Sequence, residues 1–326
     1  MSIYDTIQNK ARKSLKMKKL LLMAVLAPFL GCMSIGDCPK KADESFVIAS
    51  YNIRGPFDKG DNHWTVRIPR MVGVIEKYSL DIFGVQEAVK HVSDKLQSEL
   101  AGYRRIGCGR ELDCSGESNY IFYKQDRFEC LEYGTFWLSN TPLVSGSRYK
   151  GAGCPRTCTW GRFKDLKTGR VFTYYNTHLD HVSSKARLDG AKVLYDNGLK
   201  DALARGETVF LTGDMNETLS AVADAKSIAV VNGPRLVNAS KKGNTPDVNP
   251  IAFFESILKD SYATTETPHK GTSETFHGFK PVNKCRIDYV YTSDDVRVLS
   301  HITANDRPDG KYPSDHDAVV AVVEIR

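Results

Sequence analysis

Polar side chains able to bind metals or transfer protons follow apolar runs at six places in the sequence. These six segments are Ser50–Arg54, Gln86–Glu87, Asn176–Asp180, Gly213–Asn216, Ile287–Tyr289 and Ser314–His316. Their carboxylate and amide oxygens are the ligands that Mg²⁺ prefers, and their imidazoles exchange protons near neutral pH. Each segment alone is typical of a turn, a cap or a solvated pair. Six segments with one layout predict a shared site.

The segments can converge only if the elements that precede them end at one edge. Phe46–Tyr51 and Asp81–Val85 are short apolar runs typical of buried strands. Apolar residues at helical spacing predict a helix through Ile68–Tyr78, with Pro69 in its first turn, and another over Ser184–Leu203. Further strands are expected at Asn119–Tyr123, Thr159–Phe163, Val171–Asn176, Thr208–Leu211, Ile287–Tyr291, Val296–His301 and Ala318–Ile325. This strand-rich alternation predicts an α/β domain built as a mixed-sheet sandwich.

The first 32 residues are typical of an export signal. A basic pair precedes the apolar run Leu20–Leu30, which ends just before Cys32 and is too short to span a bilayer. Met17 is an alternative start, and a buried N-terminal helix is the alternative interpretation. Phe29–Cys32 also resembles a bacterial lipoprotein box, with Cys32 as the lipidated residue. We therefore expect export to the periplasm or cell envelope, with membrane attachment through Cys32, or secretion.

A polar linker at residues 33–44 separates this signal from a single domain over residues 45–326. The hydrophobic content of 41% and charged content of 26% are ordinary for a soluble globular domain. Residues 219–274 have the weakest pattern and are interpreted as surface elaboration on that domain.

Most of the formal net charge of +6 resides in the signal. Residues 1–32 hold six Lys and Arg against one acidic residue, which leaves about +1 for the rest. A broad basic face for polyanions is therefore not supported, although a local basic cleft remains compatible with this balance. The eight cysteines fit an oxidising compartment. Cys108 with Cys114, and Cys154 with Cys158, are candidates for local disulfides.

Taken together and in this order, the six segments resemble the endonuclease/exonuclease/phosphatase superfamily. The superfamily includes pancreatic deoxyribonuclease, abasic-site endonucleases, bacterial sphingomyelinases and inositol phosphatases. The resemblance covers roughly residues 44–326 and extends to a bacterial branch of metal-dependent hydrolases through Trp64, Gly116–Glu117, Tyr120–Tyr123, Trp137–Ser139 and Thr275–Phe279. It implies a four-layer sandwich of two mixed β-sheets packed face to face, with helices outside.

The resemblance also implies roles for the residues of the six segments. Glu87 and Asn52 would hold a divalent cation, with Asp315 joining or supporting that site. Mg²⁺ is expected, with Mn²⁺ or Ca²⁺ as alternatives. Asp214 would position the attacking water, and Asn216 would hold water or phosphate beside it.

A second group would act on the phosphate itself. His316, paired with Asp288, would stabilise the developing negative charge, and His178 would donate a hydrogen bond to the phosphate. Four further residues are expected on the substrate side: Arg54 and Arg156 as phosphate clamps, Asn176 in the loop after its strand, and His277 at an aromatic rim.

The sequence therefore predicts a metal-dependent hydrolase of phosphoesters. Nucleic acid, a lipid headgroup and a sugar phosphate all remain open as substrates, and no obligate protein partner is expected. An inositol polyphosphate 5-phosphatase is disfavoured, because Leu211 stands where that group has a tryptophan before Gly-Asp-x-Asn. The alternative is a catalytically inactive surface binding module on the same fold, against which the completeness of the six segments argues.

Overall fold

The computed structural model describes residues 44–218, 249–282 and 284–326. The chain divides into two compact units, residues 1–38 and 39–326, and all of the described residues belong to the second. The predicted export signal and Cys32 lie outside the described residues. Among the described helices, none has both the length and the apolar character needed to cross a bilayer.

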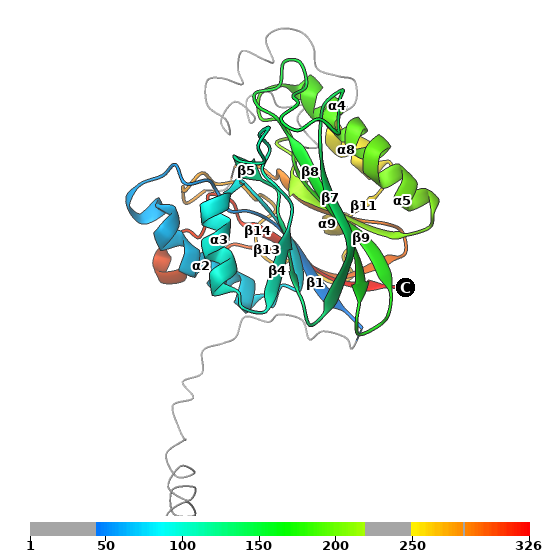
Figure 1. Ribbon diagram of the computed structural model, residues 1–326. Coiled ribbons are helices and arrows are strands. Elements are labelled where there is room, and N and C mark those ends of the chain that lie inside the picture. Colours follow the sequence, from blue (N-terminus) through cyan, green and yellow to red (C-terminus); the bar gives the residue numbers. More distant parts are fainter. Residues whose placement is uncertain (1–43, 219–248, 283) are drawn as a thin grey trace, which may run out of the picture. The chain divides into compact units, whose positions relative to one another are not determined.

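Two six-stranded mixed sheets form the centre of the domain (Figure 1). The first contains β1 (Phe46–Asn52), β2 (Ile82–Gln86), β4 (Tyr103–Ile106), β6 (Ile121–Lys124), β13 (Val296–Ala304) and β14 (Ala318–Ile325), in the order β13-β14-β1-β2-β6-β4. The second contains β7 (Phe128–Trp137), β8 (Thr157–Asp165), β9 (Val171–His178), β10 (Thr208–Asp214), β11 (Lys259–Asp260) and β12 (Asp288–Thr292), in the order β11-β12-β10-β9-β8-β7. A small pair, β3 (Ala88–Val89) and β5 (Glu117–Ser118), lies apart from both sheets.

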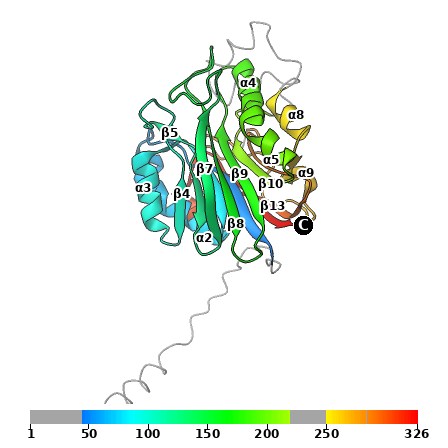
Figure 2. The ribbon, with the colours of Figure 1, turned by 45° about the vertical axis from the view of Figure 1, so that its right-hand side comes forward.

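Helices cover the outer face of each sheet (Figure 2). The first sheet carries α2 (Trp64–Lys77) and α3 (Lys90–Glu99), and the second carries α4 (Ser184–Leu194), α5 (Lys200–Ala204) and α8 (Pro250–Glu255). A one-turn helix, α9 (Ser261–Thr264), follows β11. The expected α/β four-layer sandwich is therefore confirmed.

Alternation along the strands explains these layers. In β1, Phe46 and Ile48 pack into the core between the sheets, whereas Val47 and Ala49 pack against the helices. Successive side chains of a strand point to opposite faces, so a central strand with both faces covered is apolar throughout. Stacked aromatic rings fill the space between the sheets, as in the pair Phe46–Phe172 with centroids 5.4 Å apart.

Several sequence expectations need correction. The helix expected around Ile68 begins at Trp64, so Pro69 lies in its second turn and not in its first. The helix expected over Ser184–Leu203 is interrupted by a π-helical turn at Tyr195–Leu199. Much of the segment expected as surface elaboration, residues 219–248, lies outside the described residues.

The two expected disulfides are absent from the described part of the chain, where all six cysteines are free. Cys158 is fully buried in the core that α4 covers, whereas Cys154 lines a cavity. The thiols of Cys108 and Cys114 are hydrogen-bonded to each other, and burial is the main cause that raises the pKa of Cys108 to about 11.

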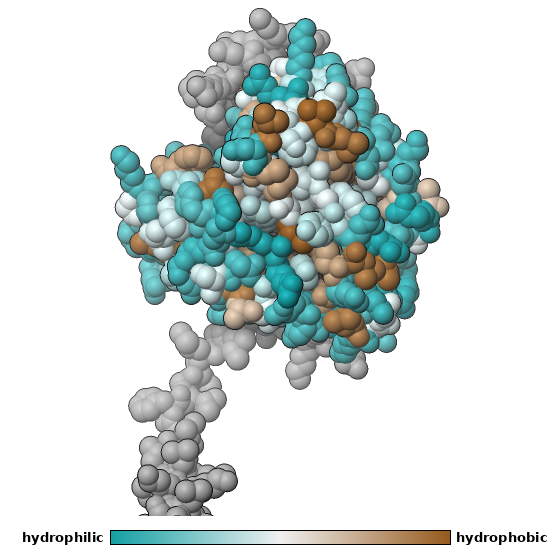
Figure 3. All heavy atoms as spheres, in the orientation of Figure 1, coloured by the Kyte–Doolittle hydropathy of each residue, from teal (hydrophilic) through white to brown (hydrophobic). Residues whose placement is uncertain are grey.

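Hydrophilic and intermediate residues predominate on the face seen in Figure 3, and hydrophobic residues form small groups. Three strongly exposed apolar side chains lie on loops, namely Leu112 (77% exposed), Leu143 (88%) and Val144 (54%). The two loops touch, because a Cβ built on Gly146 would lie 2.9 Å from the backbone nitrogen of Leu112.

Candidate active site

The ends of five strands bring the predicted segments to one edge of the sandwich. The parallel pair β1 and β2 sets Asn52 beside Gln86, and the parallel pair β9 and β10 sets His178 beside Asp214. β12 runs antiparallel to β10 and places Asp288 opposite Asp214. Parallel neighbours end at the same edge, so residues far apart in the sequence meet here.

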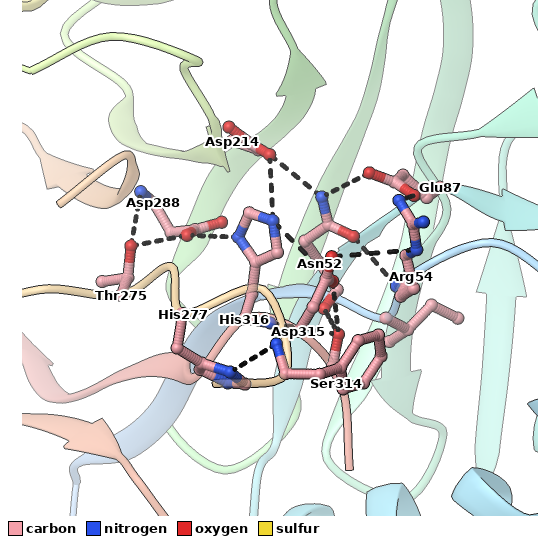
Figure 4. A network of polar contacts seen from close by, with 12 residues as sticks. Asn52, Arg54, Glu87, Asp214, Thr275, His277, Asp288, Ser314, Asp315 and His316 are labelled. Carbon is pink, nitrogen blue, oxygen red and sulfur yellow. Dashed lines mark hydrogen bonds and ion pairs between the residues drawn. The ribbon is translucent and has the colours of Figure 1, made fainter. Parts of the chain in front are cut away.

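Asn52 joins the two sheets at this edge (Figure 4). Its Nδ2 donates to Glu87 Oε1 at 3.1 Å and to Asp214 Oδ2 at 2.9 Å. Its Oδ1 accepts the backbone N–H of Arg54 at 2.9 Å, and the Ser314 hydroxyl donates to its backbone carbonyl at 2.6 Å. Because Asn52 is 0% exposed, these bonds fix the separation of the two carboxylates.

Glu87 and Asp315 face a common cation. Arg54 Nη1 lies 3.8 Å from Glu87 Oε2, and Arg54 Nε lies 3.7 Å from Asp315 Oδ2. Burial by itself raises the pKa of Glu87, but the charges of Arg54 and His316 outweigh it and hold this pKa below its usual value. The two carboxylates match the oxygen ligands of a hard divalent cation and therefore fit the predicted metal site. The expected ligand role of Asn52 needs correction, because its Oδ1 accepts the Arg54 N–H and its Nδ2, a donor, faces Glu87 and Asp214.

Three residues of the site hold the left-handed backbone conformation. Their φ angles are 56° at Arg54, 59° at Glu87 and 49° at Asn216. This conformation is uncommon for residues other than glycine and persists where surrounding contacts enforce it. The backbone N–H of Gly55 donates to Glu87 Oε2 at 3.0 Å, and that of Asn216 donates to Asp214 Oδ1 at 2.9 Å. Strained backbone thus aims side chains into the site.

Asp214 is a buried carboxyl that can exchange a proton near neutral pH. It accepts hydrogen bonds from the Asn52 side chain and the Asn216 backbone, both at 2.9 Å. Burial first, and then the negative charge of Asp288, raise its pKa to about 7. A nearby divalent cation would favour the carboxylate and lower this pKa.

His316 forms an ion pair with Asp288. Its Nδ1 lies 2.8 Å from Asp288 Oδ2, and the Thr275 hydroxyl donates to the same oxygen at 2.6 Å. Burial by itself lowers the pKa of His316, but the charge and hydrogen bond of Asp288 raise it to about 10. The ring is therefore an imidazolium, and its Nε2 atom lies 3.8 Å from Asp214 Oδ2.

Asp214, Asp288 and His316 also form a cluster whose potential ligand atoms lie within 4.8 Å of one another. An imidazolium has no lone pair for a metal and already supplies positive charge. The pair Glu87 and Asp315 is therefore a better candidate than this cluster for holding a cation.

His178 is neutral. Burial first, and then the charges of Arg156 and Arg110, lower its pKa well below its usual value. Its Nε2 lies 2.8 Å from Asn216 Nδ2, and that amide also donates to the Leu179 carbonyl at 3.0 Å. Because Nδ2 can only donate, His178 Nε2 accepts, so the neutral ring carries its proton on Nδ1, and the unprotonated Nε2 lies 3.5 Å from Asp214 Oδ2.

A cavity of about 520 Å³ opens over these side chains. Eight of the predicted site residues line it: Arg54, Glu87, Arg156, His178, Asp214, Asn216, Asp315 and His316. Asn52 and Asp288 lie directly behind this lining, each hydrogen-bonded to a residue within it.

Two predicted substrate residues do not reach the cavity. Asn176 is fully buried between the sheets, where its Nδ2 donates to the carbonyls of Val85 and Tyr120 at 2.9 and 3.0 Å. His277 is also fully buried and stacks on Tyr312, with ring centroids 4.7 Å apart. Asn176 therefore ties the sheets together, and His277 supports the loop beside Asp315, to whose carbonyl its backbone N–H donates at 3.0 Å.

Arg67 positions the site but was not predicted. It is fully buried, and its guanidinium donates to the carbonyls of Ile53, Arg54, Gly55, Asn62 and Pro313, at 2.5 to 3.3 Å. These bonds tie the loop that carries Arg54 to the loop that carries Asp315. The available signal was a charged residue adjoining the apolar face of a predicted helix, four positions before Met71.

Three further residues, Arg110, Glu117 and His181, line the same cavity. Arg110 and His181 lie in polar loops, where a charged side chain is usually solvated, so no pattern in the sequence assigned Arg110 to the site.

A family model described as the Endonuclease/Exonuclease/phosphatase family matches residues 49–316. Among solved structures, the endonuclease/exonuclease/phosphatase from Bacteroides vulgatus is 30% identical, with a TM-score of 0.71 over 86% of this chain and 99% of that chain. A mannosyl-6-phosphatase from Bacteroides thetaiotaomicron is 29% identical, with a TM-score of 0.69 over 86% and 99% of the two chains.

The catalytic domain of human Nocturnin, solved with a bound sulfate anion, is 17% identical, with a TM-score of 0.58 over 87% and 94% of the two chains. At this identity it shows a shared fold alone. No curated protein matches the chain. From the family model over most of the domain and the relatives near 30% identity, the chain belongs to the endonuclease/exonuclease/phosphatase family of phosphoester hydrolases.

Proposed function

We propose that the protein hydrolyses phosphate esters with the help of a divalent cation, through attack of a water molecule on phosphorus beside Asp214. The observation that carries this proposal is a single cavity in which three chemical functions meet. Asp214 is a proton acceptor, His316 is a cationic donor, and Glu87 with Asp315 provides a cation-binding pair.

The protein residues divide the work of the reaction. Asp214 orients the water and accepts its proton as the P–O bond forms. The His316 imidazolium donates from Nε2 toward the negative charge that develops on the phosphoryl group or the leaving oxygen. Asp288 holds that ring and balances its charge at 2.8 Å. Asn216 donates its two amide hydrogens to His178 Nε2 and to the Leu179 carbonyl, and so positions the His178 ring beside Asp214.

Glu87 and Asp315 would hold the divalent cation, with Mg²⁺ first and Mn²⁺ or Ca²⁺ as alternatives, and Asn52 would orient Glu87 through its Nδ2 donor. When bound, such a cation neutralises phosphate charge and polarises the phosphoryl oxygen. Arg54 lies against the same two carboxylates and is placed to pair with a phosphate oxygen.

The proposed substrate is a sugar phosphate. Support comes from the mannosyl-6-phosphatase among the relatives with 29% identity. A cavity of about 520 Å³ suits a small molecule. The nearly neutral domain charge does not favour a long polyanion.

A lipid headgroup is the second candidate substrate. The exposed side chains of Leu112, Leu143 and Val144 lie on touching loops and could contact a bilayer surface. We also propose that the protein acts outside the cytoplasm and is anchored through a lipid on Cys32. The basic pair and apolar run before Cys32 support this localisation.

The test is a metal-dependence screen with mannose 6-phosphate, 4-nitrophenyl phosphate, bis-4-nitrophenyl phosphate, single-stranded DNA and sphingomyelin vesicles. We expect phosphate release from the monoesters with Mg²⁺, loss of release with a chelator, and recovery when the metal is restored. In Asp214→Asn, kcat should fall by roughly 10² to 10⁴.

A matched control is Asp295→Asn, which changes an acid that accepts hydrogen bonds from the Ser293 and Thr208 hydroxyls at the opposite end of β10. It should leave kcat unchanged. Preferred cleavage of sphingomyelin would select the second candidate. A folded protein that cleaves none of these substrates with any of the three metals would favour the inactive binding module.

A further inference from the structure

The cavity extends beyond the catalytic side chains to a second group of polar residues. This distal wall consists of Arg110, Glu117, Arg156 and His181, all of which line the cavity. Arg110 lies in the loop after β4, Glu117 begins β5, Arg156 immediately precedes β8, and His181 lies three residues after the end of β9. Separate loops therefore contribute to one surface next to His178.

Each cation of the distal wall already lies near an anion. Arg110 Nη1 donates to Glu117 Oε2 at 2.5 Å, and Arg156 Nε lies 3.9 Å from Asp180 Oδ2. His181 accepts a hydrogen bond from Arg156 Nη2 at 2.8 Å through Nδ1, so the neutral ring keeps its proton on Nε2. The wall itself holds two cations, one carboxylate and a neutral imidazole, and the buried carboxylate of Asp180 behind it supplies the second negative charge. The group as a whole has no net charge but many donors and acceptors.

Arg156 has hydrogen-bonding capacity that the protein does not use. Its side chain is 6% exposed, and its buried Nε has no hydrogen-bond partner within the described residues. Asp180 does not satisfy it, because its Oδ2 lies 3.9 Å from this nitrogen, beyond hydrogen-bond range. A buried donor without a partner is costly, which is accounted for if a ligand completes it.

We propose that the distal wall binds the hydroxyl groups of a sugar, so that it holds the leaving group of a sugar phosphate while the phosphate lies over Asp214 and His316. This inference rests on the proposed hydrolase function and deepens it. Vicinal hydroxyls donate and accept at once, which suits paired guanidinium and carboxylate groups. Phe57 and Phe276 also line the cavity and provide apolar ring surface for a sugar.

A second phosphate is the competing ligand for the distal wall. Binding it would require uncompensated positive charge, whereas Glu117 already neutralises Arg110 and would repel an anion. The charge balance therefore favours a neutral polyol.

The experiment compares kcat/KM for mannose 6-phosphate with kcat/KM for 4-nitrophenyl phosphate, whose leaving group has no sugar hydroxyls. We expect Arg156→Met and Glu117→Gln each to lower the ratio of the two values by roughly 10- to 100-fold, since each removes a hydrogen bond to a charged group. Glu117→Gln changes no side-chain volume and covers the case in which the buried Arg156→Met fails to fold. The matched control is Arg104→Met, which should leave the ratio unchanged. The Arg104 side chain is exposed on β4, and among the described residues it is hydrogen-bonded only to the Gln125 side chain.

Three outcomes would overturn the assignment of the distal wall. One is an unchanged ratio in both folded variants, and another is a wild-type protein that cleaves 4-nitrophenyl phosphate but no sugar phosphate. The third is a loss confined to glucose 1,6-bisphosphate relative to glucose 6-phosphate, which would identify a second phosphate site. Failure of the wild type on every phosphoester would instead remove the proposed hydrolase function, so the two failures are distinguishable.

Discussion

Carboxylates outnumber cations around the catalytic part of the cavity. The carboxylates are Glu87, Asp214, Asp288 and Asp315, and the cations are Arg54 and His316. Grouped negative charges raise one another's pKa unless positive charge is added. Asp214 is an example, because burial and the charge of Asp288 raise its pKa. This imbalance explains why a divalent cation would be accommodated here. The charged form of His316 depends in turn on the carboxylate of Asp288, with which it is paired.

The substitution Asp288→Asn tests that dependence. The asparagine keeps the shape and can still accept the Thr275 hydroxyl, but it cannot balance an imidazolium, so His316 loses its charged form. We expect kcat for 4-nitrophenyl phosphate to fall by roughly 10² to 10⁴ while the KM changes little. The Thr275→Val variant, which keeps the carboxylate, should lose much less. Comparable losses in both variants would mean that local packing, and not the ion pair, is what the site requires.

At this scale the sequence predicted the residues with family motifs and missed those that support them. Asp214 and His316 stand in short motifs whose order is informative. Arg67 acts through five backbone carbonyls. Every residue has a backbone carbonyl, so the residue types do not indicate which carbonyls accept these hydrogen bonds. Asn176 lies within a motif but faces the space between the sheets, because its neighbours in β9 alternate between the two faces.

Among the elements, α2 matters most for the site because Arg67 extends from it to two catalytic loops. Replacing Arg67 with Met leaves several buried carbonyls without a donor. We expect the free energy of unfolding to fall by about 3 kcal/mol and kcat to fall with it, since the loops of Arg54 and Asp315 lose their connection. Urea unfolding and steady-state kinetics measure the two effects.

Arg70, three residues after Arg67 on α2, provides the control for that substitution. Its guanidinium donates to the carbonyls of Asp61 and Tyr312 from a more exposed position. Arg70→Met should cost less than about 1 kcal/mol and leave kcat unchanged. Equal effects of the two substitutions would argue against a special role for Arg67.

His301 in β13 makes the edge of the first sheet sensitive to acid. Its Nδ1 bonds the Ser261 hydroxyl at 2.9 Å, and burial first, then Arg286 and His269, lower its pKa from 6.5 to about 3. The unfolded chain therefore binds a proton that the folded chain refuses, and stability is lost as the pH falls below 6.5. We expect this residue to cost about 2 kcal/mol at about pH 5.

The measurement is the change in unfolding free energy between about pH 7 and about pH 5. His301→Gln removes the titrating group and should lose less stability over this range than the wild type. His91→Gln, on the exposed surface of α3, should keep the wild-type slope. A His301→Gln variant with the wild-type slope would show that other groups carry the acid sensitivity.

Element positions were predicted where both faces of a strand are buried, and missed where they are not. β1, β2 and β14 consist mainly of apolar residues and match the expected ranges closely. β7 lies at a sheet edge and exposes Glu129 and Tyr133, so its sequence has no apolar run. Edge strands need only one covered face, which weakens the hydrophobic signal.

For the whole molecule, the site depends on how closely the two sheets approach. A polar seam joins them beneath the cavity: Gln86 Nε2 donates to Asn176 Oδ1 at 2.7 Å, and the Tyr174 hydroxyl donates to the Ala49 carbonyl at 2.8 Å. Buried polar groups of this kind require partners and therefore fix one relative placement of the sheets. No local pattern in the sequence specifies this seam, because its members are spread over β1, β2 and β9.

Gly84 lies in this seam and sets the distance between the sheets. A Cβ added there would lie 2.3 Å from the Asn176 side chain and 2.6 Å from Thr212 Oγ1. Gly84→Ala should therefore force the sheets apart and lower the free energy of unfolding by about 1 to 3 kcal/mol. It should also reduce kcat, because Glu87 directly follows β2 and His178 ends β9. Gly73→Ala on α2 meets no atom within 4 Å and should instead stabilise the fold by about 0.5 to 1 kcal/mol. Thermal unfolding and kinetics on the same samples decide the matter: if Gly84→Ala is as stable and as active as the wild type, the spacing of the sheets does not control the geometry of the site.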